Sequence, residues 1–376
     1  MKKSEQFIYL YFLSKINRLG NVRILNILSS ADTYEKLAGL SIRELRRIER
    51  IDEKIANEIL KAQNHYKKFR SEAENLIEIC AKKNINILTI FDEEYPANLR
   101  NIFDPPIVLY YRGKLTQEDK YSISIVGTRI ATEYGKSVCS KLVDSLSKYE
   151  IPVISGFAKG IDSIAHKKCI DNGNLTYAVF GSGVDVVYPA ENRKLYNEII
   201  ETGAVISEFE PGTGPEKVNF PKRNRLISGI SLGTVIIETG IKGGSLITAE
   251  FALDQNRELF AVPGNVNSKQ SQGTNDLIKK GTAKLINNVD DILAELQNKL
   301  KHKLENKSEK KEAIPAHVDL SKDEKTILSL LNSEPVNIDV INDKTGINIS
   351  ECLVHLLMLE FKGLVRQHPG KFFTRV

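Results

Sequence analysis

The sequence predicts an α/β protein in which a doubly wound, mostly parallel sheet stands between a small all-α domain and three helices with a hairpin. Three observations predict this fold. Apolar residues recur at helical spacing through residues 1–80, β-rich runs alternate with helix-length segments through 81–297, and helical spacing returns after a charged stretch. Alternating strands and helices are typical of a parallel sheet, because its crossovers need helices that cover both faces.

The first 80 residues are predicted to form several short helices. They include SIRELRRIER and the long run that begins at DEKIANEIL, with Ser41 and Asp52 as N-caps. Residues 1–75 contain 15 Lys and Arg against 10 Asp and Glu, whereas the rest of the chain holds 38 of each. The whole net charge of +5 therefore belongs to this region. It fits a solubilising surface or contact with nucleic acid, and both interpretations stay open.

The middle of the chain is predicted to form the sheet. After an irregular lead-in with strand-like ends come seven short apolar runs, and several of them end in glycine at the carboxyl edge where such sheets bind ligands. The runs are SISIVG (122–127), PVISG (152–156), TYAVFG (176–181), AVISEF (204–209), TVIIET (234–239), ELFAVPG (258–264) and AKLIN (283–287).

A charged segment, 298–317, is poor in apolar residues and is predicted to be a linker to a last domain at 318–376. That domain is predicted as three helices followed by a hairpin, which is a winged-helix pattern. Its third helix carries Glu351 and Glu360 and no cation before Lys362. Because duplex readers place Arg, Asn or Gln on this helix, contact with protein is favoured over contact with duplex DNA.

Several classes of function lack their signatures. The sequence has no phosphate-binding loop of the GxxxxGKS type, no HExxH motif, and no metal-spaced histidines or cysteines. The stretch FGSGVDVVYP fails the dinucleotide fingerprint at Val186, where glycine is needed. Four scattered cysteines and no long apolar run predict a cytoplasmic protein without a membrane span or a signal peptide.

Four strand-to-helix turns carry small residues together with cations or hydrogen-bond donors. Glycine lets main-chain amides approach phosphate closely, so four such turns on one sheet edge predict a ligand with several phosphates. Three cations at the start of a predicted helix point the same way, because that end of a helix attracts anions. The turns are VGTR (Arg129), SGFAKGID (Ser155, Gly156, Phe157, Lys159, Gly160), FPKRNR (Lys222, Arg223, Asn224, Arg225) and TGIKGGSLIT (Lys242, Gly244, Ser245).

Two ligands fit such a cluster. A nucleotide cofactor would use two or three phosphates, whereas single-stranded nucleic acid would bring cations to its backbone and aromatic faces to its bases. Phe157 and Phe220 lie inside the basic turns and would stack on bases or pack in the core. An enzyme would also need an acid or base, and the candidates at strand ends are Asp162, Asp185, Glu208 and Glu238. Asp162 and Asp185 are more typical of caps on helices or turns.

The sequence resembles the DNA-processing protein A family (DprA, also called Smf) of bacterial natural transformation. The resemblance covers about residues 95–290 and includes VGTRIATEYG, SGFAKGIDSIAH, SEFEPGTGPEKVNFPKRNRLISGIS and VIIETGIKGGSLITAEFAL in the family's order. It implies an extended Rossmann-like domain without a nucleotide cofactor. It also implies a non-enzymatic protein that binds single-stranded DNA, forms a homodimer through that domain, protects incoming strands and loads the RecA recombinase.

Position by position, the resemblance implies which residues meet DNA. Ala131, Phe157 and Gly243 depart from the family pattern, but none of these changes removes a cation. The cationic and amide side chains would line the pocket, and the small residues would give main-chain or hydroxyl contacts. The first group is Arg129, Lys159, Arg223, Asn224, Arg225 and Lys242, and the second is Ser155, Gly156, Gly244 and Ser245.

Two alternatives stay open. Related Rossmann-like phosphoribohydrolases use a PGGxGT loop with a following glutamate; here the loop is TGIKGGSLIT, and Glu250 lies one and a half turns further along. In the second alternative the chain is mainly a RecA adaptor, and its DNA binding is secondary.

The family often carries an N-terminal domain resembling a sterile alpha motif or a helix-hairpin-helix. Here NRLGNVR lacks the second glycine of a helix-hairpin-helix turn, so strong duplex binding is not expected.

Overall fold

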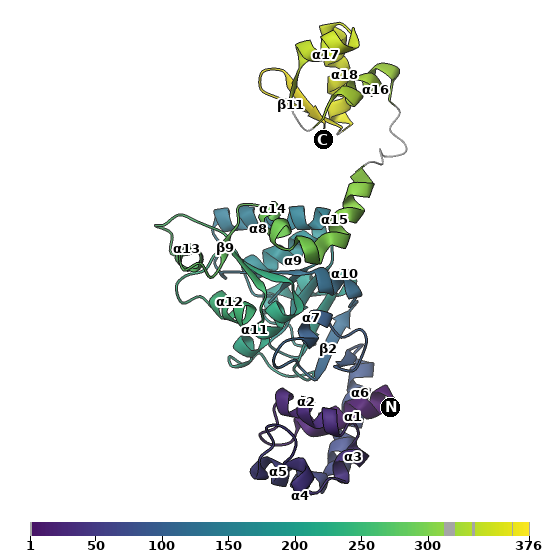
Figure 1. Ribbon diagram of the computed structural model, residues 1–376, viewed down its shortest axis with the longest axis vertical. Helices are drawn as coiled ribbons and strands as arrows, with labels where there is room; N and C mark the ends of the chain where they lie inside the picture. The colour runs from purple at the N-terminus through teal and green to yellow at the C-terminus, as the bar shows by residue number, and fades with distance from the viewer. Residues whose placement is uncertain (1, 312–319, 333–334, 363, 376) are drawn as a thin grey trace. The chain divides into compact units, whose positions relative to one another are not determined.

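The computed structural model describes residues 2–311, 320–332, 335–362 and 364–375. Its internal contacts divide the chain into two units, Met1–Leu304 and Glu305–Val376. The first unit contains an N-terminal helical part and the large sheet (Figure 1). Each unit is described by itself.

The N-terminal part is helical, as the apolar spacing predicts. Its core is formed by fully buried residues such as Leu10, Phe12 and Ile27, and α1 packs along α6. Both predicted caps are confirmed: the Ser41 hydroxyl accepts from the amide of Glu44, and the Asp52 carboxylate accepts from the amide of Ile55 at 2.8 Å. The helices are α1 (Lys3–Ser14), α2 (Asn21–Ser30), α3 (Tyr34–Ala38), α4 (Ile42–Leu45), α5 (Glu53–Gln63) and α6 (Tyr66–Lys82).

The sheet has nine strands in the order β1-β2-β6-β5-β4-β3-β7-β8-β9. All seven predicted strands are present and parallel to one another. The lead-in adds β1 and β2, which pair antiparallel at one edge. The strands are β1 (Asn86–Thr89), β2 (Val108–Gly113), β3 (Ile123–Val126), β4 (Val153–Ser155), β5 (Thr176–Val179), β6 (Ala204–Ser207), β7 (Gly233–Ile236), β8 (Glu258–Ala261) and β9 (Lys284–Leu285).

The strand order creates a switch point between β3 and β7. From β3 the chain runs through β4 and β5 to β6 on one side, and then returns to lay β7, β8 and β9 on the other. The turns that follow β4, β3 and β7 therefore leave neighbouring strands at the same edge. In an open parallel sheet, the crevice at such a point is where ligands bind.

Helices cover both faces of the sheet. Because strand side chains alternate, Ile123 and Ile125 pack on the side of α8, α9 and α14, whereas Val126 packs on the side of α11 and α12. The α11 helix also packs closely against α12. The remaining elements of this part are α7 (Ala97–Arg100), η1 (Gln117–Tyr121), α8 (Glu133–Lys148), α9 (Ile161–Asp171), η2 (Ala190–Asn192), α10 (Arg193–Thr202), α11 (Asn219–Ile230), α12 (Ser245–Asp254), α13 (Gln272–Lys279) and α14 (Val289–Glu295).

The predicted linker differs from the structure in its first part. Residues Gln297–Lys311 form a helix, α15. Leu300 is buried and Leu304 packs against the same core as α8 and α14, because their spacing of four residues places both on one side of the helix. Residues 312–317 of the predicted linker lie outside the described part of the chain.

The second unit has the predicted winged-helix order. Its core contains Ile327, Ile341, Cys352, Leu356 and Leu359. A short strand, β10, joins the predicted hairpin to give a sheet in the order β10-β12-β11. The elements are α16 (Lys322–Leu330), β10 (Val336–Asn337), α17 (Ile338–Thr345), α18 (Ile349–Phe361), β11 (Val365–His368) and β12 (Phe372–Arg375).

Some general features bear on function. The four cysteines are buried and free. Among the described residues, no helix has the length and apolar character needed to cross a membrane. Within the same residues, no group of three His, Cys, Asp or Glu side chains is placed to hold a metal ion.

Candidate functional site

A cavity of about 760 Å³ lies at the carboxyl edge of the sheet, beside the switch point. Its walls come from the turn after β3, the start of α11, and the turn that leads from β7 into α12. The residues that line it include Thr128, Arg129, Tyr188, Lys217, Phe220, Arg223, Asn224, Gly244, Ser245 and Thr248. Five of the predicted site residues are therefore in its wall: Arg129, Arg223, Asn224, Gly244 and Ser245.

The turn that carries Arg129 is fixed by a buried carboxylate. Glu238, two residues after β7, accepts from the amide of Thr132 at 2.9 Å and also from its hydroxyl. The main-chain carbonyl of Glu238 accepts from the amide of Thr128 at 2.6 Å. Gly135 leaves room for this carboxylate, since a Cβ there would lie 2.3 Å from a Glu238 oxygen. The main chain is thus held rigidly, and the exposed Arg129 side chain extends from it.

The turn after β4 is locked by Arg223. This residue is only 6% exposed, and its Nη1 atom donates to the carbonyl of Gly156 at 2.7 Å and to that of Val179. Asp162 accepts from the amides of Gly156 and Ala158, at 3.2 and 3.3 Å. Burial lowers the pKa of Arg223 to about 10 and raises the pKa of Asp162 to about 6, although each favours the other's charged form.

Gly160 brings two of the turns together. Its φ angle is 82°, in the left-handed region, and a Cβ at this position would lie 2.3 Å from the carbonyl oxygen of Thr128. Only glycine combines that conformation with such a close approach. Lys159 and Arg129 are consequently carried on turns that touch one another.

Arg225 faces away from the cavity wall. It is 7% exposed, and its guanidinium donates to the Glu208 carboxylate and, at 2.8 Å, to the carbonyl of Asp104. The three cations of FPKRNR therefore differ: Arg223 and Arg225 hold the fold together, and Lys222 is exposed. A direct DNA contact by Arg225 stays a prediction.

The predicted lysines are exposed and do not belong to the residues that line the cavity. Lys159 forms an ion pair with Glu191, at 2.6 Å between Nζ and the carboxylate. Lys222 lies on the first turn of α11, and Lys242 in the turn before α12. Long side chains at these positions extend into solvent, where a flexible strand would meet them.

Three predicted residues are buried beneath the turn. The Ser155 hydroxyl donates to the carbonyl of Ile125 at 2.6 Å, and both main-chain polar groups of Gly156 are bonded to Asp162 and Arg223. The ring of Phe157 is 1% exposed and lies 4.8 Å from that of Phe180. It has no free face for a base in this conformation, because the core already covers both sides.

Sequence reasoning missed two residues of the wall. Tyr188 is about half exposed, and its ring lies 5.6 Å from that of Phe220, which also lines the cavity. Lys217 adds an exposed cation three residues before Phe220. Lys217 extends the basic run KVNFPKRNR and was therefore detectable, whereas a single tyrosine in VVYPAENR carries no signal that separates it from a core residue.

Ser245 offers a free hydrogen-bonding group. It is the first residue of α12 and lines the cavity, and its buried Oγ atom has no hydrogen-bond partner within the described chain. Helix N-termini favour anions, and a buried hydroxyl without a partner costs free energy. Together with Arg129 and Lys217 it suits a phosphate, and the Tyr188–Phe220 surface suits a base.

An acid or base for catalysis is not evident at this cavity. Glu250, which would follow the glycine loop of a phosphoribohydrolase, is exposed on α12 and is not one of the lining residues. Asp162 lines the cavity, but its carboxylate is engaged with two amides of its own turn. The arrangement can hold an anionic, base-bearing ligand.

Comparison with known proteins places these features in a family. The family described as DNA recombination-mediator protein A matches residues 86–297, and a family described as DprA winged helix domain matches residues 311–371. The chain is 31% identical over 404 residues to a protein from Synechocystis named Protein Smf, and the match covers all of both chains. It is 39% identical over 209 residues to the DNA processing protein DprA of Streptococcus pneumoniae, covering 56% of this chain and 73% of that one.

Two solved structures are similar in fold. The X-ray structure of DNA processing protein A from Streptococcus pneumoniae has a TM-score of 0.63 and 32% identity, and the match covers 77% of this chain and 97% of that one. A structure of DNA processing protein A from Helicobacter pylori has a TM-score of 0.51 and 31% identity, with 57% and 96% covered. The Helicobacter pylori structure concerns the single-stranded DNA binding mode of that protein.

Proposed function

The chain belongs to the DNA recombination-mediator protein A family, and from this premise we propose that it binds single-stranded DNA at the cavity beside the β3–β7 switch point. One observation carries the proposal. The cavity joins the Tyr188–Phe220 aromatic surface to exposed cations and to the free Ser245 hydroxyl. Stacking of bases combined with cations along the backbone is the usual way of binding a single strand.

The predicted site residues divide into two roles in this proposal. Arg129, Lys159, Lys222 and Lys242 contact the strand, with Lys217 and Tyr188 added to them. Arg223, Arg225, Ser155, Gly156, Phe157 and Gly160 shape the turns that present these contacts. Asn224, Gly244 and Ser245, which line the cavity, also take the first role and bind phosphate or base edges directly.

The single-stranded DNA binding mode of the Helicobacter pylori protein supports single-stranded DNA as the ligand here. A nucleotide cofactor is the alternative with the same chemistry. The chain has no tryptophan, so Tyr188→Trp introduces a single fluorophore into the cavity wall. We expect oligothymidylate to quench it at low ionic strength and mononucleotides to leave it unchanged. Quenching by mononucleotides alone would favour a cofactor site.

We place this binding in the DNA processing of natural transformation, in the cytoplasm and without catalysis. The protein protects incoming single strands and passes them to the RecA recombinase, acting as a homodimer through the sheet-bearing unit. Support comes from the family's description as a recombination mediator and from relatives named as DNA processing proteins. In a capture experiment with purified RecA, Arg129→Ala should keep RecA binding and lose strand delivery. If the variant delivers strands normally, DNA binding is secondary and the chain is mainly an adaptor.

The winged-helix unit is assigned to protein contact. The α18 helix buries Cys352, Leu356 and Leu359 in its own core. Its opposite side exposes Val354, Leu357, Met358 and Phe361, which recur at helical spacing, and Phe361 is 78% exposed. A face of this kind lacks the donors that read base edges, and it matches the apolar faces that helices use to bind proteins.

A further inference from the structure

The N-terminal part contains the same helical turn twice, 32 residues apart. In each copy an isoleucine lies two residues before an arginine whose main chain is in the left-handed conformation. These pairs are Ile16 with Arg18, where φ is 65°, and Ile48 with Arg50, where φ is 62°. The main-chain hydrogen bonds also repeat, from Leu19 to Ile16 and from Ile51 to Ile48. Each turn then leads into a helix, α2 or α5. The sequence reveals no repeat, because few residues besides the isoleucine, the arginine and the apolar positions are shared.

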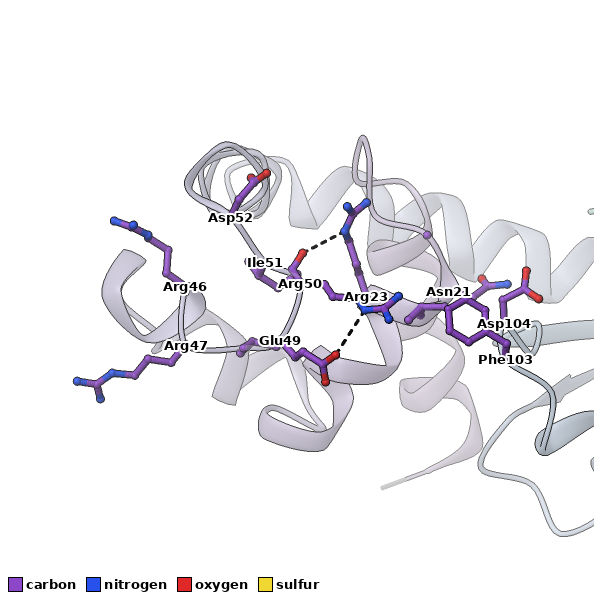
Figure 2. Close-up of a pocket in the computed structure, with 13 residues that line it drawn as sticks. Asn21, Arg23, Arg46, Arg47, Glu49, Arg50, Ile51, Asp52, Phe103 and Asp104 are labelled. Atoms are coloured by element: carbon purple, nitrogen blue, oxygen red, sulfur yellow. Dashed lines mark hydrogen bonds and ion pairs between the residues drawn. The ribbon is translucent and has the colours of Figure 1, made fainter.

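The two turns are joined by a single side chain. Arg23, in the first turn of α2, donates from Nε to the carbonyl of Arg50 at 3.1 Å and from Nη1 to the carbonyl of Arg18 at 2.8 Å. Figure 2 shows the first of these bonds crossing between the copies. The pair of turns is therefore held as one unit.

A second open cavity, of about 1090 Å³, is lined by residues 20–23 at the start of α2, by residues 46–52 around the second turn, and by the segment that carries Phe103. Four arginines line it: Arg23, Arg46, Arg47 and Arg50. In Figure 2, Arg46 and Arg47 extend outward from their turn, and Arg50 points toward Phe103. The Arg50 guanidinium lies 5.3 Å from the centre of the Phe103 ring, which is 70% exposed.

The carboxylates of this cavity are already engaged within the protein. Asp52 caps α5 through the amide of Ile55, Asp104 pairs with Arg225 at 3.5 Å, and Glu49 pairs with Arg50 at 3.4 Å. The Arg47 side chain forms no hydrogen bond or ion pair with another described residue. The cavity thus presents available positive charge beside an exposed aromatic face.

We propose that this cavity is a second binding surface for single-stranded DNA, which holds the part of a long strand that extends beyond the first cavity. The inference rests on the proposed function. Arg46 and Arg47 neutralise phosphates, and Phe103 with Arg50 stacks on a base. Arg46 also pairs with Glu53 at 3.4 Å, but both side chains are exposed, so a phosphate can replace this weak contact.

The α11 helix links the walls of the two cavities, and this favours one strand that reaches both. Asn224 lines the first cavity, and the next residue, Arg225, binds Asp104 in the wall of the second. An exposed aromatic ring is of use to an unpaired base and of little use to a closed duplex. The missing second glycine of the hairpin turn, which argues against strong duplex binding, is consistent with this ligand.

The test compares short and long strands on the full chain. A single groove covers about 4–16 nucleotides, so an oligothymidylate of about 6 fills the first cavity alone and one of about 30 reaches both. With the double variant Arg46→Gln, Arg47→Gln we expect unchanged affinity for the short strand and at least about fivefold weaker binding of the long one. The salt slope for the long strand should fall by roughly 1.4, which is two contacts at about 0.7 each.

Arg43→Gln is the matched control, because Arg43 is exposed on α4 and outside the cavity lining. The control removes one charge and the double variant removes two. If the control loses half as much binding free energy as the double variant, the total charge of the region is responsible and the inference is overturned. Unchanged binding of the long strand by the double variant would overturn it too, while the proposed function would stand. Failure of the wild type to bind even the short strand would instead contradict the proposed function.

Direct contact can be measured with Phe103→Trp, the only tryptophan in that chain. We expect quenching by the long strand and none by the short strand at saturation. Quenching by both strands would mean that short strands also bind at this ring, which would overturn the assignment of the first cavity to short strands. Quenching by neither strand would rule out the stacking contact. A duplex that quenches as strongly as the long single strand would identify a duplex site and overturn the assignment.

Discussion

Arg223 donates a hydrogen bond from Nη1 to the carbonyl of Gly156, 2.7 Å away, and thereby ties α11 to the turn after β4. The same atom also donates to the carbonyl of Val179. A cation that looks like a ligand contact in the sequence is thus a buried link between three segments of the fold. Arg223 also lines the cavity, so its charge contributes to the wall while its hydrogen bonds hold the fold.

Arg223→Ala should destabilise the protein and also weaken DNA binding. Removal of a buried charged partner leaves Asp162 uncompensated and costs about 3–5 kcal/mol. Arg129→Ala should leave the melting temperature unchanged, since that side chain is exposed, and should weaken binding by about 1–3 kcal/mol. Thermal unfolding and fluorescence anisotropy of both variants check this.

The two arginines serve as controls for each other. If Arg223→Ala keeps the wild-type melting temperature, the guanidinium has a role in binding and not in the fold. If Arg129→Ala and Lys159→Ala both keep full affinity, the proposed cavity is not the DNA site.

The contrast between these arginines marks what sequence can predict. The cluster FPKRNR, the strands in their order along the chain and the shared sheet edge all follow from spacing and composition. Whether a cation is used by the fold depends on carbonyls that come from distant segments, such as Gly156 and Val179 for Arg223. Those partners become visible only once the chain is folded.

Glu191→Gln should strengthen DNA binding. Its carboxylate holds Lys159 at 2.6 Å on the surface, in competition with a phosphate. Exposed pairs are worth little, so the gain in affinity should be modest. The salt slope should become steeper by about 0.7, one further phosphate contact. An affinity that falls in Glu191→Gln would contradict the placement of Lys159 beside the strand, with Glu133→Gln on α8 as a matched control.

Tyr188→Ala should weaken binding by about 1–3 kcal/mol, the usual effect of losing one stacked base. Tyr188→Phe should keep most of the affinity, because the ring and not the hydroxyl provides the stacking surface. Titration of both variants with a short oligothymidylate gives the comparison. If Phe loses as much as Ala, the hydroxyl makes the contact and the stacking interpretation is wrong.

Asp119→Asn should stabilise the protein more at high pH than at low pH. Burial raises the pKa of Asp119 from 3.8 to about 7, and its Oδ2 atom has no hydrogen-bond partner among the described residues. A carboxyl whose folded pKa is raised stabilises the fold below pH 3.8 and loses that stability as pH rises toward 7. One pKa unit corresponds to 1.36 kcal/mol, so the free energy of unfolding of the wild type falls by up to about 4 kcal/mol over this pH range.

Thermal unfolding of wild type and Asp119→Asn at about pH 5 and pH 8 checks this directly. The difference in melting temperature should grow in favour of the variant as pH rises. A difference that is equal at both pH values would show that Asp119 does not titrate within this range.

The features missed by the sequence have a common cause. Tyr188 forms an aromatic surface only together with Phe220, which lies 32 residues away in the sequence. The centres of the two rings are 5.6 Å apart. The repeated turn in the N-terminal part is preserved in main-chain conformation and hydrogen bonding, not in residue identity. Local patterns predicted the elements and their order, whereas pairs formed by tertiary packing were not accessible from spacing.

The most direct test of single-strand binding is fluorescence anisotropy of labelled single-stranded and duplex oligonucleotides of equal length, across a salt series and without nucleotide. Wild type and Arg129→Ala are measured together. We predict a strong preference for the single strand, a slope of log K against log salt of roughly −3 to −4 for about four to six contacts, and a loss in the variant. Weak and equal binding to both forms, unchanged by Arg129→Ala, would contradict single-strand binding at this cavity.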